Sequence, residues 1–362
     1  MNIHLLYKLL ALVAMLIGGS MAFSLPWAYW APNAVWKYER QGFLALLGSM
    51  AICFTVGGAL RYLGRNGTGQ LFRKEAMAVV GLSWVLATIL GALPFALSGT
   101  RVTPERSMSM FTVDGFVDAM FESQSGFSTT GATVLTDLEV PDDGTGPLVA
   151  RCILFWRSST HFLGGLGIIV LFVAILGQGS AGKALMRAEM PGPSSSTPQA
   201  RMQHTAWVLF LIYSGLNASL AVLLMLEGLS PFDAICHAFG TMATGGFSTY
   251  NASVGHFAAV GDPHAPLIEM TITVFMVLAG TNFMLMYWVL IGQPRQMLAD
   301  VEWRTYICVI LAVTVLVVGF GLYCGDFGNF SGMTATEQAK QDAPNDDPLS
   351  AKTAKTAIRM RR

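Results

Sequence analysis

The sequence predicts an all-α integral membrane protein with about seven transmembrane helices, in which a unit of helix, re-entrant loop and helix repeats. Three observations lead to this fold class. The 362-residue chain is 53% hydrophobic and 12% charged, whereas a soluble globular chain carries about 25% charged residues. Several apolar runs are long enough to cross a bilayer, and two glycine-bearing loops with a shared pattern lie between such runs.

The apolar runs predict the spans. A helix needs about 20 apolar residues to cross a hydrocarbon core of roughly 30 Å. Seven stretches meet this length, at about 4–31, 41–63, 74–99, 148–178, 204–227, 265–292 and 304–325. The first is longer than the apolar core of a signal peptide and another span follows at once, so we expect it to be retained.

Lysine and arginine predict the orientation. They concentrate in the loops after the second, fourth and sixth spans, at Arg61, Arg65, Arg73, Lys74, Lys183, Arg187, Arg201, Arg295 and Arg304. Because short loops rich in these residues stay in the cytoplasm, we expect the N-terminus there and both glycine-bearing loops on the outer side. Lys37 and Arg40 in the first outer loop oppose this pattern.

The two glycine-bearing loops form an internal repeat. They read FESQSGFSTTGATVL at 121–135 and PFDAICHAFGTMATGGFSTYN at 231–251. Asp118 and Asp233 are separated by 115 residues, and so are Gly131 and Gly246, so the loops align without a gap. Glycine-interrupted segments in corresponding places of a membrane protein point to a permeation site.

Each loop begins with a segment that suits a short helix. Residues 116–127 and 232–242 could each make about three turns, half the thickness of a bilayer. We therefore expect re-entrant helices that dip into the membrane and return as extended chain. Asp118 and Asp233 are expected at the helix starts, where the helix dipole favours a carboxylate, while the C-terminal ends would stabilise a cation.

The residues after these short helices are candidate ion ligands. A potassium ion that crosses a membrane exchanges its hydration shell for backbone carbonyls, and glycine gives the chain the freedom to aim them. Neither loop carries a carboxylate at this point, so the site suits a monovalent cation rather than calcium, which prefers acidic ligands. The candidates, here termed the first and second loop triplets, are Thr129, Thr130, Gly131 and Thr244, Gly245, Gly246.

The fourth span carries the intramembrane ionisable residues, which are candidates for function. We expect Arg157 to pair with Glu122 or with a loop carbonyl in a structural role. A metal-ligating role for His161 is disfavoured because no second ligand lies nearby in the sequence. Gly164, Gly165 and Gly167 are expected to allow close helix packing.

Several function classes are disfavoured. The net charge is zero and there is no basic stripe, which argues against a nucleic-acid partner. Ser158, Ser159 and His161 do not share a helix face well and no GxSG setting occurs, so we expect no enzymatic activity. The five cysteines are Cys53, Cys152, Cys236, Cys308 and Cys324. None of them has CxxC spacing, so the sequence does not indicate a disulfide frame or a metal site.

The repeat divides the chain. Gly165 and Gly280 follow the same 115-residue shift as the loops. The predicted domains are an extra helix pair at 1–70, a first helix–loop–helix repeat at 71–190, a second at 191–300, the first helix of a third at 301–325, and a polar tail at 326–362. The tail lacks a sustained apolar period, so we expect it to be disordered.

Four motifs resemble a known family: SGFSTTGATVL, FWRSSTHFLGGLGIIVL, RAEMPGP at 187–193 and ATGGFST. Together they are similar to the Trk/Ktr/HKT superfamily, specifically its bacterial TrkH type, over about residues 1–325. The resemblance implies potassium uptake across the bacterial inner membrane and repeats of potassium-channel type, four of them around one pore. It also implies a homodimer with a cytoplasmic TrkA-type nucleotide-binding regulatory subunit. The two loop triplets match the family's filter, with Ala132 and Phe247 flanking them.

The third and fourth filter loops of the family have no counterpart in this sequence. Two loops would leave half of the ring open, and each unsatisfied carbonyl in hydrocarbon costs several kcal/mol. The alternative hypothesis is therefore a non-conducting truncated fragment or assembly module of such a transporter.

Overall fold

A computed structural model describes residues 2–29, 36–67, 73–103, 106–138, 149–165, 167 and 199–324. This part of the chain is a helical bundle with one short antiparallel hairpin, β1 (Arg101–Thr103) and β2 (Arg106–Ser107). Its helices are α1 (Ile3–Met21), η1 (Ala22–Ala28), α2 (Trp36–Leu63), α3 (Arg73–Ser98), α4 (Val113–Phe127), α5 (Arg151–Gly165), α8 (Gln199–Leu226), α9 (Pro231–Met242), α10 (Gly255–Ala259), α11 (Ala265–Ala279), α12 (Phe283–Leu290), α13 (Pro294–Ala299) and α14 (Val301–Cys324).

Five of the described helices are long and apolar enough to span a membrane. They are Ile3–Ala28, Glu39–Leu63, Met77–Ser98, Trp207–Leu226 and Val301–Cys324, and they match the first, second, third, fifth and seventh predicted spans. The fourth, 148–178, is described as far as α5. Its remainder apart from Gly167, the RAEMPGP motif and the polar tail lie outside the described residues.

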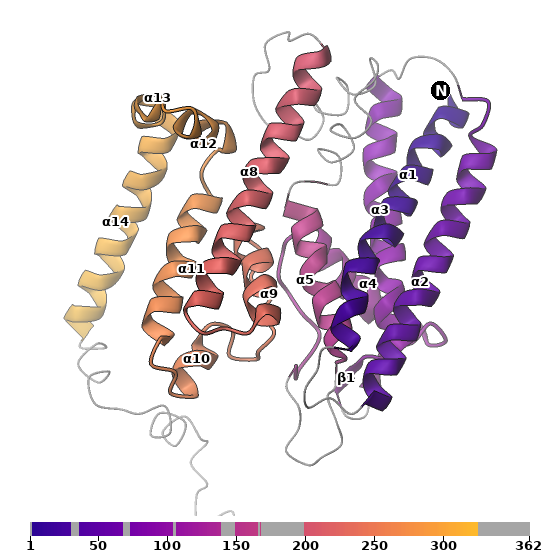
Figure 1. The fold of residues 1–362 in the computed structure, drawn as a ribbon, viewed down its shortest axis with the longest axis horizontal. Coiled ribbons are helices and arrows are strands. Elements are labelled where there is room, and N and C mark those ends of the chain that lie inside the picture. The colour runs from indigo at the N-terminus through magenta and orange to yellow at the C-terminus, as the bar shows by residue number, and fades with distance from the viewer. Residues whose placement is uncertain are drawn as a thin grey trace, which may run out of the picture.

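The sixth predicted span, 265–292, is not the single helix that its apolar run suggests. It is divided into α11 and α12, whose axes meet at 103°. Asn282 causes a new helix to start, because its side chain accepts a hydrogen bond from the Met284 N–H at 3.0 Å. The signal in the sequence was Gly280-Thr281-Asn282, because glycine can end one helix and asparagine can begin the next. In Figure 1, α12 and α13 lie across one end of the bundle.

The bundle places the two short helices at the same level. In Figure 1, α1, α2, α3, α4 and α5 form one side and α8, α9, α11 and α14 the other. Both α4 and α9 lie in the half that is distant from the N-terminus. The C-terminal end of α2, the start of α8 and the α12–α13 segment all lie at the N-terminal end. The described parts of the three predicted positive loops therefore share one end of the bundle.

Two tyrosines join successive units of the bundle in the same way. The Tyr213 hydroxyl of α8 donates to the Phe162 carbonyl of α5 at 3.2 Å. The Tyr306 hydroxyl of α14 donates to the Val277 carbonyl of α11, also at 3.2 Å. Since Phe162 and Val277 are 115 residues apart, α14 meets α11 as α8 meets α5. The predicted domain division fits this contact but remains a prediction.

Glycines make these joints possible, as expected from the sequence. A Cβ on Gly165 would collide with the Tyr213 hydroxyl and lie 2.9 Å from the Ala243 Cβ, and a Cβ on Gly280 would collide with Tyr306. A Cβ on Gly164 would collide with the backbone of Phe127. These contacts confirm the packing role of Gly164 and Gly165.

Substituting Gly165 tests the joint. Gly165→Ala should lower the free energy of unfolding by about 1–3 kcal/mol, because overpacked sites must shift to admit a methyl group. Gly215→Ala on α8 is the matched control: nothing lies within 4 Å of its added Cβ, so helix propensity should leave stability unchanged or raised by up to about 1 kcal/mol. Unfolding of the purified protein in detergent measures both. Equal effects would contradict the packing account.

Candidate functional site

The two loop triplets adopt the same unusual backbone conformation. The first and third residues of each lie in the left-handed region, with φ of +53° and +76° in one loop and +56° and +84° in the other. Threonine is β-branched, so its presence there is a genuine outlier, and such strain costs about 1–3 kcal/mol per residue. The four left-handed positions are Thr129, Gly131, Thr244 and Gly246.

The preceding helices hold the loops by accepting hydrogen bonds from their N–H groups. After α4, Thr129 donates to the Gly126 carbonyl at 3.1 Å and Thr130 to the Ser125 carbonyl at 2.9 Å. After α9, the equivalent donors 115 residues later make the same bonds: Thr244 to Thr241 at 3.0 Å and Gly245 to Gly240 at 2.9 Å. The helix C-termini therefore fix both loops.

The carbonyl groups of the triplets are left without partners. Within the described residues, none of their six oxygens accepts a hydrogen bond. A carbonyl away from water costs free energy unless something satisfies it, and an ion is one such partner. The structure also brings the two predicted triplets together, because a Cβ on Gly131 would collide with the carbonyl oxygen of Gly245.

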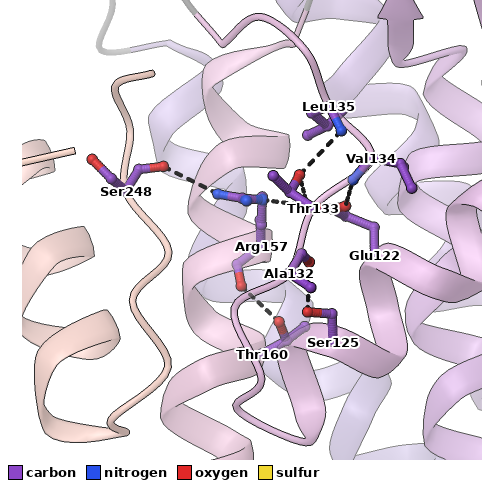
Figure 2. Close-up of polar contacts among 9 residues, drawn as sticks. All are labelled: Glu122, Ser125, Ala132, Thr133, Val134, Leu135, Arg157, Thr160 and Ser248. Atoms are coloured by element: carbon purple, nitrogen blue, oxygen red, sulfur yellow. Dashed lines mark hydrogen bonds and ion pairs between the residues drawn. The ribbon is translucent and has the colours of Figure 1, made fainter. Parts of the chain in front are cut away.

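A buried ion pair connects the chain segments that leave the two loops, here termed the first (132–138) and second (247–251) exit segments. The predicted pairing of Arg157 with Glu122 is confirmed, with Nε and Oε1 2.6 Å apart and both side chains at most 3% exposed. Glu122 also accepts from the Thr133 hydroxyl at 2.8 Å and the Val134 N–H at 3.2 Å. Arg157 donates to the Ser248 carbonyl at 3.0 Å. Figure 2 shows Arg157 between the two exit segments.

A second tie joins the exit segments at Asn251. Its amide nitrogen donates to the Asp137 carboxylate at 2.6 Å, and its amide oxygen accepts from the Leu138 N–H at 2.9 Å. Sequence reasoning missed Asn251 and Ser248. The available signal was a polar run directly after the second loop triplet.

The second exit segment is also tied to its own short helix, α9. The Thr249 hydroxyl donates to the Asp233 carboxylate at 2.8 Å. One ring nitrogen of His237 lies 3.0 Å from the Ser248 hydroxyl and the other 2.8 Å from the Asp233 carbonyl. His237 was likewise missed, although it follows Asp233 by one helical turn.

The acidic residues of the short helices differ from the prediction. Asp233 lies in the first turn of α9, as expected. Asp118 does not lie at the start of α4, because this helix begins at Val113 and Asp114 occupies its first turn. Asp118 instead forms a salt bridge of 2.6 Å with Arg106.

The flanking residues have separate contacts. The Ala132 carbonyl accepts a hydrogen bond from the Ser125 hydroxyl at 2.6 Å (Figure 2). Phe247 is buried against Arg157 and His161 of α5. His161 itself is fully buried, and neither ring nitrogen has a hydrogen-bond partner among the described residues.

The apolar spans and the paired loops define a class, the helical membrane proteins with a transporter fold. The model of one such family, described as TrkH, cation transport protein, matches residues 45–324. The chain belongs to this family.

Curated relatives and a solved structure give the same assignment. The chain is 34% identical to the Trk system potassium uptake protein TrkH of Salmonella typhimurium, over 87% of this chain and 59% of that protein. It is 32% identical to the Trk system potassium uptake protein TrkG of Escherichia coli, over 79% and 54%. The crystal structure of the potassium transporter TrkH from Vibrio parahaemolyticus matches with a TM-score of 0.66 and 28% identity, over 88% and 60%. The chain thus spans at most about 60% of the length of these proteins.

The buried ion pair gives a testable prediction. Glu122→Ala or Arg157→Ala should each cost about 3–5 kcal/mol of stability, because each leaves a buried charge without its partner. The double variant should cost clearly less than the sum. Arg304→Ala is the control: its side chain is exposed and donates to the backbone carbonyl of Asp300, so its loss should cost at most about 0.5 kcal/mol. Additive single effects, measured by unfolding in detergent, would contradict the pairing.

Proposed function

We propose that this chain takes part in potassium uptake across the bacterial inner membrane, as the translocating subunit of a Trk system. The observation that carries this proposal is the set of six carbonyl groups in the loop triplets, which accept no hydrogen bond from the described residues. Potassium is the ion named for the relatives of this chain. On this proposal the ion is the transported substrate.

The geometry suggests how the ion would pass. Successive residues that alternate between left-handed and other conformations can turn their carbonyls to one side, and both triplets have this alternation. Potassium would lose water at the outer mouth, bind these oxygens and leave into a cytoplasmic vestibule. The C-terminal ends of α4 and α9 immediately precede the triplets, so their partial negative charge would favour a cation. We propose no covalent chemistry.

The orientation and partners are part of the same proposal. The described parts of the predicted positive loops share one end of the bundle with the N-terminus (Figure 1), which supports a cytoplasmic N-terminus. Family membership supports a homodimer and a cytoplasmic TrkA-type nucleotide-binding regulatory subunit. Besides these, the bilayer is the expected partner.

The alternative is a non-conducting fragment or assembly module of such a transporter. One observation favours it: α14 buries a single residue, Gly321, within the described structure. An apolar helix with so little cover is suited to packing against further protein as well as against lipid. Conduction therefore has to be tested on this chain directly.

Growth at low potassium tests the proposal in a bacterial strain that lacks its own potassium uptake. The strain would carry either this chain alone or residues 1–325 joined to the remaining part of a longer TrkH relative. Growth with the chain alone supports a working pore. Growth only with the fusion supports the fragment alternative, and growth with neither contradicts the uptake role.

Glycine substitutions test the filter assignment in whichever version grows. Gly131→Ser and Gly246→Ser should lower rubidium uptake about tenfold or more, because a side chain at these left-handed positions adds strain of about 1–3 kcal/mol. Gly261→Ser is the matched control: its φ is +76° as well, but it lies outside the loop triplets. Uptake that resists both triplet substitutions would overturn the assignment.

A further inference from the structure

The side chain of Phe247, next to the second loop triplet, is held between two residues of α5. The Arg157 guanidinium carbon lies 3.5 Å from the Phe247 ring centroid. The His161 ring stacks on the same phenyl ring at 4.0 Å with an interplanar angle of 11°. Two groups this close to one centroid cannot share a face, so the phenyl ring lies between them. Residues four apart on a helix can form such a clamp because they lie on one face.

The same histidine ring fills the space beside Gly245. A Cβ built on Gly245 would collide with the Cε1 atom of His161 and lie 2.6 Å from both ring nitrogens. Gly245 does not have a left-handed φ, so its backbone conformation alone does not require glycine. Gly246 is the opposite case: its φ is +84°, but nothing lies within 4 Å of its added Cβ.

The first loop triplet shows that the backbone tolerates a side chain at this position. Thr130 is the equivalent of Gly245 in the 115-residue repeat, and Thr130 is exposed whereas Gly245 is buried. Met276 is the equivalent of His161, and it is 56% exposed. Helix α5, which follows the first loop, thus supports the second loop through His161. Among the described residues no such contact joins the equivalent residues Thr130 and Met276, and both are exposed.

We propose that His161 is a positioning residue that fixes the second loop triplet, and that position 245 is glycine because the imidazole occupies the space of a side chain. This inference rests on the proposed potassium site. Since neither ring nitrogen has a partner among the described residues, the ring acts through its shape. The clamp on Phe247 and the contact with Gly245 together set where the Gly245 carbonyl lies relative to Gly131.

A suppressor experiment tests this role in the purified full chain, with the thermal unfolding midpoint measured in potassium and in sodium. Gly245→Ala should lower the midpoint and weaken the stabilisation specific to potassium. His161→Ala alone should lower both the midpoint and the potassium-specific stabilisation, because Phe247 loses one side of its clamp. In the Gly245→Ala background, His161→Ala should instead restore part of the midpoint, because it makes room for the methyl group, but it should not restore the potassium-specific stabilisation. His161→Leu, which keeps the volume, should not restore the midpoint.

Gly246→Ala is the matched control, because its strain comes from backbone conformation and His161→Ala should not relieve it. The proposal is overturned if Gly245→Ala is harmless, if His161→Ala does not rescue it, or if Gly246→Ala is rescued equally well. If potassium does not stabilise the wild-type chain more than sodium, the proposed ion site fails. The midpoints without added ion then still decide whether His161 and Gly245 are coupled.

Discussion

The buried Glu122–Arg157 ion pair is the interaction on which the paired loops depend. Removing such charges from water costs several kcal/mol per ion, so the pair is tolerable only with good geometry and further hydrogen bonds. Those bonds come from both exit segments, through the Val134 N–H and the Ser248 carbonyl. Strained threonines likewise persist only where the surroundings over-determine them. The buried ion pair therefore needs the hydrogen bonds from both exit segments, and the strained loops need the ion pair to hold those segments in place.

The repeat preserves backbone geometry more than side-chain chemistry. The left-handed positions and the helix-cap hydrogen bonds recur with the same 115-residue shift. The side chains that fix the exits differ: Glu122 holds the first, whereas Asp233 and His237 hold the second. This difference is reasonable if the ligands are backbone carbonyls, because any set of side chains that produces the same path is then equivalent.

Local sequence patterns predicted five of the seven spans as single helices and the two short helices, since apolar runs and glycine positions are local signals. The assignment of both loop triplets as ion ligands stays a prediction. The Glu122 pairing was also predictable, because an intramembrane arginine needs a partner. Contacts between the repeats were not. The roles of Ser248 and Asn251 arise only when the two exit segments meet. The break before α12 lies at Asn282, within a stretch whose overall apolar composition suggests one span.

The two loops differ in how neighbouring helices contact them. The second triplet rests on α5 through His161, whereas the exposed Thr130 of the first has no such cover in the described residues. The first loop is therefore held chiefly by its own helix and by Glu122. If the proposed pore closes as a ring of such loops, a further helix would occupy the place beside Thr130 that His161 of α5 occupies beside Gly245. Closing the ring would thus complete the first loop's support as well as its set of carbonyls.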